Sequence, residues 1–170
     1  MPTPTQPLRD EHKELMPHVA SLRLAADSVG DQPIGAVRRN VDAAYDFLAS
    51  HLLPHAQAEE RALYPVVAKL IGGAEATATM SRDHVEVTRL TGELDALRPG
   101  LAGATISPAQ ARSLRAVLYG LSALVTLHFA KEEEVYLPIL DKHLSEAEAD
   151  KMFEAMEAAA KEAKQTAASH

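Results

Sequence analysis

The chain has 170 residues, 46% of them hydrophobic and only 4% aromatic, and a formal net charge of −7. This length suits one domain with a single core, and the composition favours packed helices over a sheet. The absence of cysteine excludes disulfides, zinc fingers and iron–sulfur clusters, and the acidic balance argues against a nucleic-acid partner.

The N-terminus does not combine a basic region with an apolar core, so we expect no signal peptide. No apolar run approaches the length that a membrane span needs. The sequence therefore predicts a soluble, cytoplasmic protein that works without a membrane.

Break residues and apolar periodicity divide the chain into helices. Residues 1–7, which include three prolines, are expected to form a flexible N-terminal segment. Five helices are predicted, over residues 8–29, 34–71, 76–98, 108–143 and 146–166. The fold class is therefore all-α, with an up-down-up-down four-helix bundle over residues 8–143 and a C-terminal fifth helix and tail over residues 144–170.

Local signals support several of these boundaries. Ser107 is a good N-cap and is followed by Pro108 at the first helical position, and Ser145 with Glu148 forms a capping box. Prolines that should kink the predicted helices are Pro54, Pro65 and Pro138. The fifth helix carries one apolar stripe, formed by Met152, Phe153, Met156, Ala159 and Ala163. This stripe predicts that the fifth helix packs across the bundle or makes a dimer contact.

Residues 55–65 and 128–138 share one pattern: His, three residues, Glu-Glu, four residues, Pro. Positions i and i+4 of a helix lie on the same face. His55 and Glu59 should therefore point the same way, as should His128 and Glu132. An imidazole and a carboxylate on one face, presented twice, are typical of a site for iron, manganese or zinc.

The repeat extends beyond these motifs, because His12 and His84 lie in similar surroundings. They precede the motif histidines by 43 and 44 positions. Each half is thus predicted to be a helical hairpin, and two such hairpins with approximate two-fold symmetry would bring four histidines and two carboxylates together. The predicted metal ligands are His12, His55, Glu59, His84, His128 and Glu132.

The same repeat separates these ligands from the other histidines. His18 and His51 correspond to leucines in the other half, which indicates ordinary core positions. His51 lies one turn from His55, so it could still contact a metal ligand from outside or line a substrate channel. The remaining two, His143 and His170, are expected to be solvated.

Residues 8–143 resemble the hemerythrin-like family, the HHE cation-binding domain. The resemblance rests on one histidine on the first and third helices and His-x3-Glu on the second and fourth. It implies a four-helix bundle that holds two non-haem iron ions with an oxo or hydroxo bridge. It also implies that the four histidines are terminal ligands, and that Glu59 and Glu132 bridge the irons.

The chain departs from oxygen-carrying members of that family at two points. Those proteins have a further histidine where this chain has Thr88. The absence of that ligand disfavours simple oxygen carriage, unless water, His51 or a tyrosine completes the ligand shell of the iron. They also have an aspartate five positions after the last histidine, where this chain offers Glu132 at four and Glu133 at five, so either glutamate could bridge. Glu60 and Glu133 are otherwise expected to point elsewhere. The nearby tyrosines, Tyr64 and Tyr136, are expected to pack in the core.

These features predict a di-iron protein that binds or reacts with peroxide, O₂ or NO in oxidative-stress defence or sensing. Turnover, by peroxide decomposition or NO reduction, stays open. The alternative is a reversible O₂ carrier or store, or an iron-status sensor. The chain contains no Glu-x-x-His, which disfavours ferritin-type chemistry, and no obvious general base for a zinc hydrolase. A homodimer is a possible assembly.

Overall fold

The computed structural model describes residues 3–168. Within this range the secondary structure is helical, and there is no strand. The predicted all-α class is therefore confirmed. Residues 1 and 2, and the predicted solvation of His170, lie outside the described residues. The α-helices are, in chain order, α1 (Gln6–Ser28), α2 (Ile34–Phe47), α3 (Leu53–Ala58), α4 (Tyr64–Ile71), α5 (Glu75–Leu97), α6 (Pro108–Lys131), α7 (Leu137–His143) and α8 (Glu146–Ala168). Three π turns and one 3₁₀ turn connect some of them: η1 (Leu48–Leu52), η2 (Glu59–Leu63), η3 (Arg98–Leu101) and η4 (Glu132–Tyr136).

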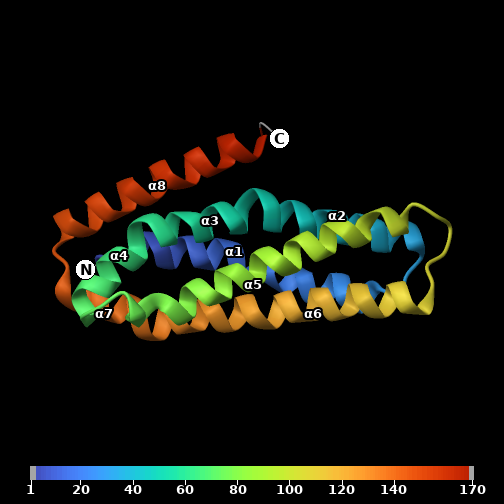
Figure 1. The fold of residues 1–170 in the computed structure, drawn as a ribbon, viewed down its shortest axis with the longest axis horizontal. Coiled ribbons are helices and arrows are strands. Elements are labelled where there is room, and N and C mark those ends of the chain that lie inside the picture. Colours follow the sequence, from blue (N-terminus) through green and yellow to red (C-terminus); the bar gives the residue numbers. More distant parts are fainter. Residues whose placement is uncertain (1–2, 169–170) are drawn as a thin grey trace.

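Four helical arms, namely α1, α2–α4, α5 and α6–α7, extend along the long axis of the molecule, and α8 lies outside them next to α3 (Figure 1). Two apolar clusters fill the interior. One joins α1, α2, α5 and α6 and includes Leu22, Leu48, Leu94 and Leu118. The other lies around α4, α7 and α8 and includes Leu63, Leu137 and Met156.

The predicted helix boundaries agree with the structure to within a few residues. Ser107 accepts a hydrogen bond from the Gln110 N–H and completes a capping box. Gly72 ends α4 with a φ of 109°, a left-handed conformation in which a side chain would be strained. Helix α1 begins at Gln6, two residues earlier than predicted, and the Thr5 N–H donates to Asp141 Oδ1 over 2.9 Å.

The three π turns were not predicted, although each ends two residues before one of the predicted kink positions. In each, the residue before the proline donates its N–H to the carbonyl five residues earlier: Leu53 to Leu48, Tyr64 to Glu59, and Leu137 to Glu132. A proline has no N–H and its ring clashes with the carbonyl four residues back, so a wider turn relieves both problems. Pro17 lies within α1 without a π turn, so proline alone does not impose one.

Helix α8 packs on its own chain, against α3 and η2. Met152, Met156 and Ala159 are buried in the same cluster as Ala58 and Ala62. Of the two roles expected for the apolar stripe of the fifth helix, packing across the bundle is therefore the one observed.

Among the described residues, one helical stretch, residues 108–143, is long and apolar enough to meet a membrane-span criterion. The sequence reading did not anticipate this. Its large side chains Leu114, Leu118 and Leu121 are buried, and α6 packs against α1 and α5, as expected for a core helix.

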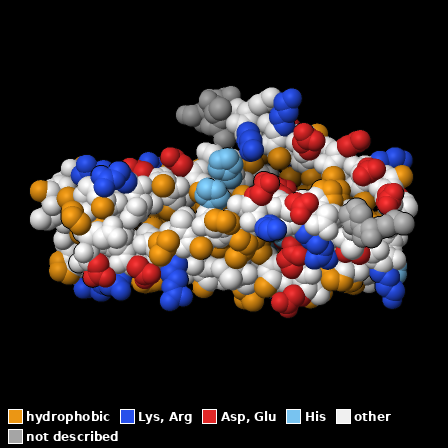
Figure 2. Space-filling view, turned by 180° about the vertical axis from the view of Figure 1, so that it is seen from behind, with side chains coloured by type: hydrophobic (Ala, Val, Ile, Leu, Met, Phe, Trp, Pro, Cys, Tyr) orange, Lys and Arg blue, Asp and Glu red, His pale blue; other side chains and the backbone are white. Residues whose placement is uncertain are grey.

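On the face shown in Figure 2, Lys and Arg side chains lie interspersed with Asp and Glu.

Candidate metal centre

The structure brings all six predicted ligands together in the interior, at the junction of the two apolar clusters. His12 comes from α1, His55 from α3, His84 from α5 and His128 from α6, while Glu59 and Glu132 are the first residues of η2 and η4. All six are buried.

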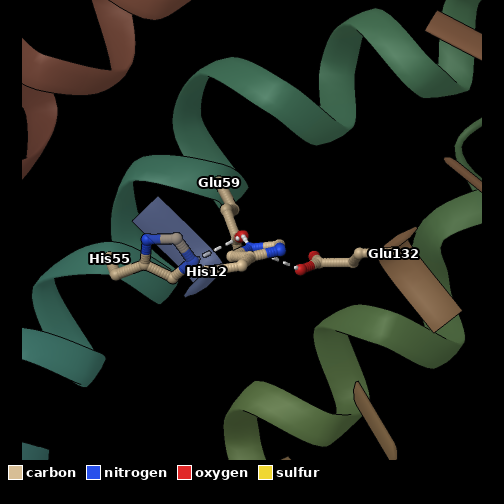
Figure 3. Close-up of side chains that lie close together, drawn as sticks. All are labelled: His12, His55, Glu59 and Glu132. Atoms are coloured by element: carbon tan, nitrogen blue, oxygen red, sulfur yellow. Dashed lines mark ion pairs between the residues drawn. The ribbon is translucent and has the colours of Figure 1, made fainter. Parts of the chain in front are cut away.

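One half of the centre is formed by His12 and His55 with the two glutamates (Figure 3). Nε2 of His55 lies 2.8 Å from Glu59 Oε1, and Nε2 of His12 lies 3.4 Å from Glu132 Oε2. One donor atom from each of these four residues lies within 4.8 Å of the other three. We call this group the first subsite.

The other half, which we call the second subsite, is formed by His84 and His128 with Glu59. Nε2 of His84 lies 3.2 Å from Glu59 Oε2 and 3.0 Å from Nε2 of His128. Nε2 of His128 also lies 3.3 Å from Glu132 Oε1.

Each glutamate therefore presents one oxygen to each subsite. Glu59 directs Oε1 towards His12 and His55 and Oε2 towards His84 and His128. Glu132 directs Oε2 towards His12 and Oε1 towards His128. A carboxylate so placed can be shared by two cations. Of the two glutamates that the sequence left open, Glu132 is the one that faces inwards.

All four histidines hold a carboxylate on their outer nitrogen, Nδ1. The pairs, with distances of 2.7–2.9 Å, are His12 with Glu133, His55 with Glu11, His84 with Glu60, and His128 with Asp83. Such a partner fixes the proton on Nδ1 and leaves the Nε2 lone pair directed at the centre. The sequence reading missed this layer, although the repeat carried the signal: Glu11 and Asp83 each directly precede a ligand, and Glu60 and Glu133 each directly follow one.

Two of these outer carboxylates are paired with cations and two are not. Arg9 donates to Glu133 over 2.6 Å and to Asp141 over 3.1 Å. Lys131 contacts Asp83. Glu60 accepts instead from the Ser81 hydroxyl over 2.8 Å.

The electrostatics of the site favour a cation between anionic carboxylates. Burial alone would raise the pKa of Glu59, but the charge of His55 and the nearby imidazoles of His12 and His128 hold that pKa well below its usual value. Burial alone would lower the pKa of His128, yet Glu132 and Glu59 raise it to about 10. A metal ion at Nε2 would take the place of the proton that these carboxylates stabilise.

Tyr64 reaches the second subsite, contrary to the expectation that it only packs in the core. Its hydroxyl donates to Glu132 Oε1 over 2.9 Å and lies 3.3 and 3.4 Å from Nε2 of His128 and His84. Tyr136, which lies within the second motif, donates instead to the Ala76 carbonyl over 2.8 Å. Burial and the carboxylates of Glu59 and Glu132 raise the pKa of Tyr64, so its hydroxyl holds its proton.

The inward-facing atoms supply a test of whether the residues fit metal ions. Nε2 of His12 and of His55, both oxygens of Glu59 and Oε2 of Glu132 are buried without a hydrogen-bond partner. Buried polar atoms are almost always satisfied. Imidazole nitrogens and carboxylate oxygens that converge in this way are the donor set of a two-metal site, and the residues fit the implied group.

The other histidines lie away from the centre. His18 and His51 are exposed, and the ring of His18 stacks on Phe47 at 5.2 Å. Neither occupies the core position that the repeat predicted. His143 is exposed, as expected.

A comparison with protein families agrees with this geometry. The family model described as "Hemerythrin HHE cation binding domain" matches residues 3–140. The match covers the four long arms almost to their end and stops before α8. The curated proteins and the solved structures gave no significant match.

Proposed function

Since this chain belongs to the hemerythrin HHE cation-binding family, we propose that it is a non-haem di-iron protein that reacts with small oxygen or nitrogen species. The observation that carries the proposal is the placement of Glu59 and Glu132, each of which directs one oxygen to the first subsite and the other oxygen to the second. We further propose that residues 8–143 form the di-iron unit as an up-down-up-down bundle, with α8 as an added cover.

In this proposal His12 and His55 hold one iron, His84 and His128 hold the other, and the two glutamates bridge them. Four neutral imidazoles leave the pair more positive than a carboxylate-rich site would. When bound, two metal ions that share carboxylates supply electrons to, or accept them from, a small ligand at their open positions.

The protein's own groups prepare the site for such a ligand. The outer carboxylates orient the four imidazoles. Tyr64 holds a proton at Oη, 2.9 Å from Glu132 Oε1, and can donate a hydrogen bond to a ligand at the second subsite. The ring of Phe129 stacks on His12 at 4.4 Å and keeps water from that side of the first subsite.

We favour defence against, or sensing of, peroxide and NO over oxygen carriage. The position at which oxygen carriers have a further histidine is Thr88, whose hydroxyl bonds to the His84 carbonyl and does not face the centre. Tyr64 is the side chain that fills this part of the shell. The alternative is a carrier, store or iron-status sensor without turnover.

Reconstitution with Fe(II) tests the proposal. Two irons per chain are expected, with two peaks at the iron edge in anomalous difference maps, one by each histidine pair. After air is admitted, one-way oxidation with O₂ release from peroxide supports defence, whereas a spectrum that reverses on deoxygenation supports carriage. A chain that retains no iron would overturn the di-iron proposal.

A further inference from the structure

Two grooves flank the metal centre at corresponding positions of the two hairpins. One, of about 370 Å³, lies between α3 and α5, and we call it the α3–α5 groove. Its lining includes Leu53, Ala56, Glu60, His84, Val85 and Thr88. The other, the α1–α6 groove, is lined by the corresponding residues of the other half, including Arg9, His12, Lys13, Met16, Phe129 and Glu133.

The floors of the two grooves differ at one pair of corresponding positions. In the α1–α6 groove, Phe129 stacks on His12 at 4.4 Å and also lies 5.9 Å from His55, ring centre to ring centre. The position that corresponds to Phe129 is Ala56 in the α3–α5 groove. The Tyr64 ring stacks on His84 at 5.4 Å, but the residue at the groove position itself is only an alanine. The His84 side chain is 11% exposed, compared with 3% for His12.

The two grooves also differ in charge. Arg9 and Lys13 line the α1–α6 groove. The residues that line the α3–α5 groove include no lysine or arginine, and its only charged side chain other than histidine is Glu60, 37% exposed. A carboxylate beside an otherwise mainly apolar path repels anions and leaves uncharged molecules unaffected.

We propose that the α3–α5 groove is the route by which small uncharged molecules, such as NO and hydrogen peroxide, reach the metal pair at the second subsite. This inference rests on the proposed function. A ligand that passes Ala56 arrives beside His84, within the subsite towards which the Tyr64 hydroxyl points. At the first subsite the corresponding position is filled by Phe129, whose ring lies against His12 and narrows the approach from the α1–α6 groove.

Matched bulky substitutions at the rims of the two grooves test this route. Thr88 and Val85 are exposed on the α3–α5 groove, and their counterparts on the α1–α6 groove are Met16 and Lys13. The measurement is the association rate of NO with the Fe(II)-loaded full chain by stopped-flow spectroscopy, with iron content determined for every variant. Thr88→Phe is expected to slow NO association about tenfold, while Met16→Phe leaves the rate unchanged.

Val85→Phe and Lys13→Phe form a second matched pair, in case Thr88→Phe disturbs the fold. Azide is an anion, so its association rate should be lower than that of NO. Glu60→Gln removes the carboxylate of the groove and should bring the two association rates closer together. Equal NO rates in both matched pairs, with two irons per chain retained, would overturn the route while leaving the di-iron proposal intact. Loss of iron from the unmodified chain would instead contradict the proposed function itself.

Discussion

The two subsites have the same ligands but different surroundings. Each has two histidines, a share of both glutamates and a carboxylate behind every imidazole. Around this common set, the first subsite is covered by Phe129 and linked through Arg9 to Asp141, whereas the second is open above Ala56 and approached by Tyr64. The difference teaches that the repeated hairpin keeps the arrangement of the inward-facing histidines and glutamates, while the residues next to them differ between the halves.

The largest effect is expected from substitution of the glutamates that the two subsites share. Glu59→Ala deletes a side chain that presents one oxygen to each subsite, so we expect loss of both irons. Metal analysis of the purified variant checks this. Glu132→Ala should behave in the same way, and His143→Ala should keep its metal. Unchanged iron content in both glutamate variants would contradict the shared-carboxylate assignment.

Helix α8 packs mainly on one hairpin, against α3 and η2, so its removal should affect the halves unequally. Truncation after Leu144 exposes Ala58 and Ala62 and removes Met152 and Met156 from the core. We expect the free energy of unfolding to fall by more than about 3 kcal/mol, measured by urea denaturation. As point controls, Met156→Ala should destabilise and the exposed neighbouring Glu157→Ala should not.

The outer carboxylates allow each subsite to be weakened separately. Glu133→Gln and Glu60→Gln each remove the anionic partner of one histidine, and each should lower metal affinity by about 10- to 100-fold. The ion affected should differ: the one at His12 for the first variant and the one at His84 for the second. Calorimetric titration with site occupancies from anomalous maps measures this. Equal loss at both ions in both variants would show that the subsites do not act separately.

The two tyrosines sharpen the comparison further. Tyr64→Phe removes the hydroxyl that bonds to Glu132, and we expect the affinity for the second ion to fall about tenfold and the visible spectrum of the iron form to change. Tyr136→Phe loses only a bond to a backbone carbonyl, so its spectrum should match that of the unmodified chain. Identical spectra for all three proteins would exclude Tyr64 from the centre.

The smallest effect concerns the Arg9 network, which the second subsite lacks. Burial would raise the pKa of Asp141, but hydrogen bonds from Thr5 and Arg9 lower it below its usual value. A carboxylate whose pKa is lower in the folded chain stabilises the fold at a pH above its unfolded pKa, which is about 3.9. This stabilisation is lost as the pH falls through the pKa of the folded state. Asp141→Asn should thus cost about 1 kcal/mol at pH 7 and almost nothing near pH 2, by thermal melts. A cost that does not depend on pH would contradict this.

Much of the fold follows from local signals in the sequence. The helix boundaries rest on caps and breaks such as Ser107 and Gly72, which act within one turn and are therefore visible without tertiary structure. The six inward-facing residues were found because a duplicated sequence gives each candidate a partner, and the structure places them together.

The parts that the sequence did not reveal depend on contacts between arms. Tyr64 lies nine positions after His55, whereas Tyr136 lies eight positions after His128, and this offset of one residue turns the two rings towards different neighbours. Glu60 and Glu133 do turn away from the inward face, as expected, but the histidines that they meet lie on different arms. The π turns were missed because ideal helical spacing had been assumed across each motif.

The π turn at Glu59–Leu63 has a consequence for how the protein tolerates change. Its wide hydrogen-bonded ring holds one residue more than an ordinary turn, so a one-residue deletion there would let the backbone rewind into an α-turn while the residues downstream keep nearly their present orientation. An insertion has no such extra residue to give up, and it would turn Tyr64 away from the second subsite by about 100°. The segment is consequently expected to accept the loss of one residue, or an exchange at an exposed position such as Arg61, where it does not accept the gain of one.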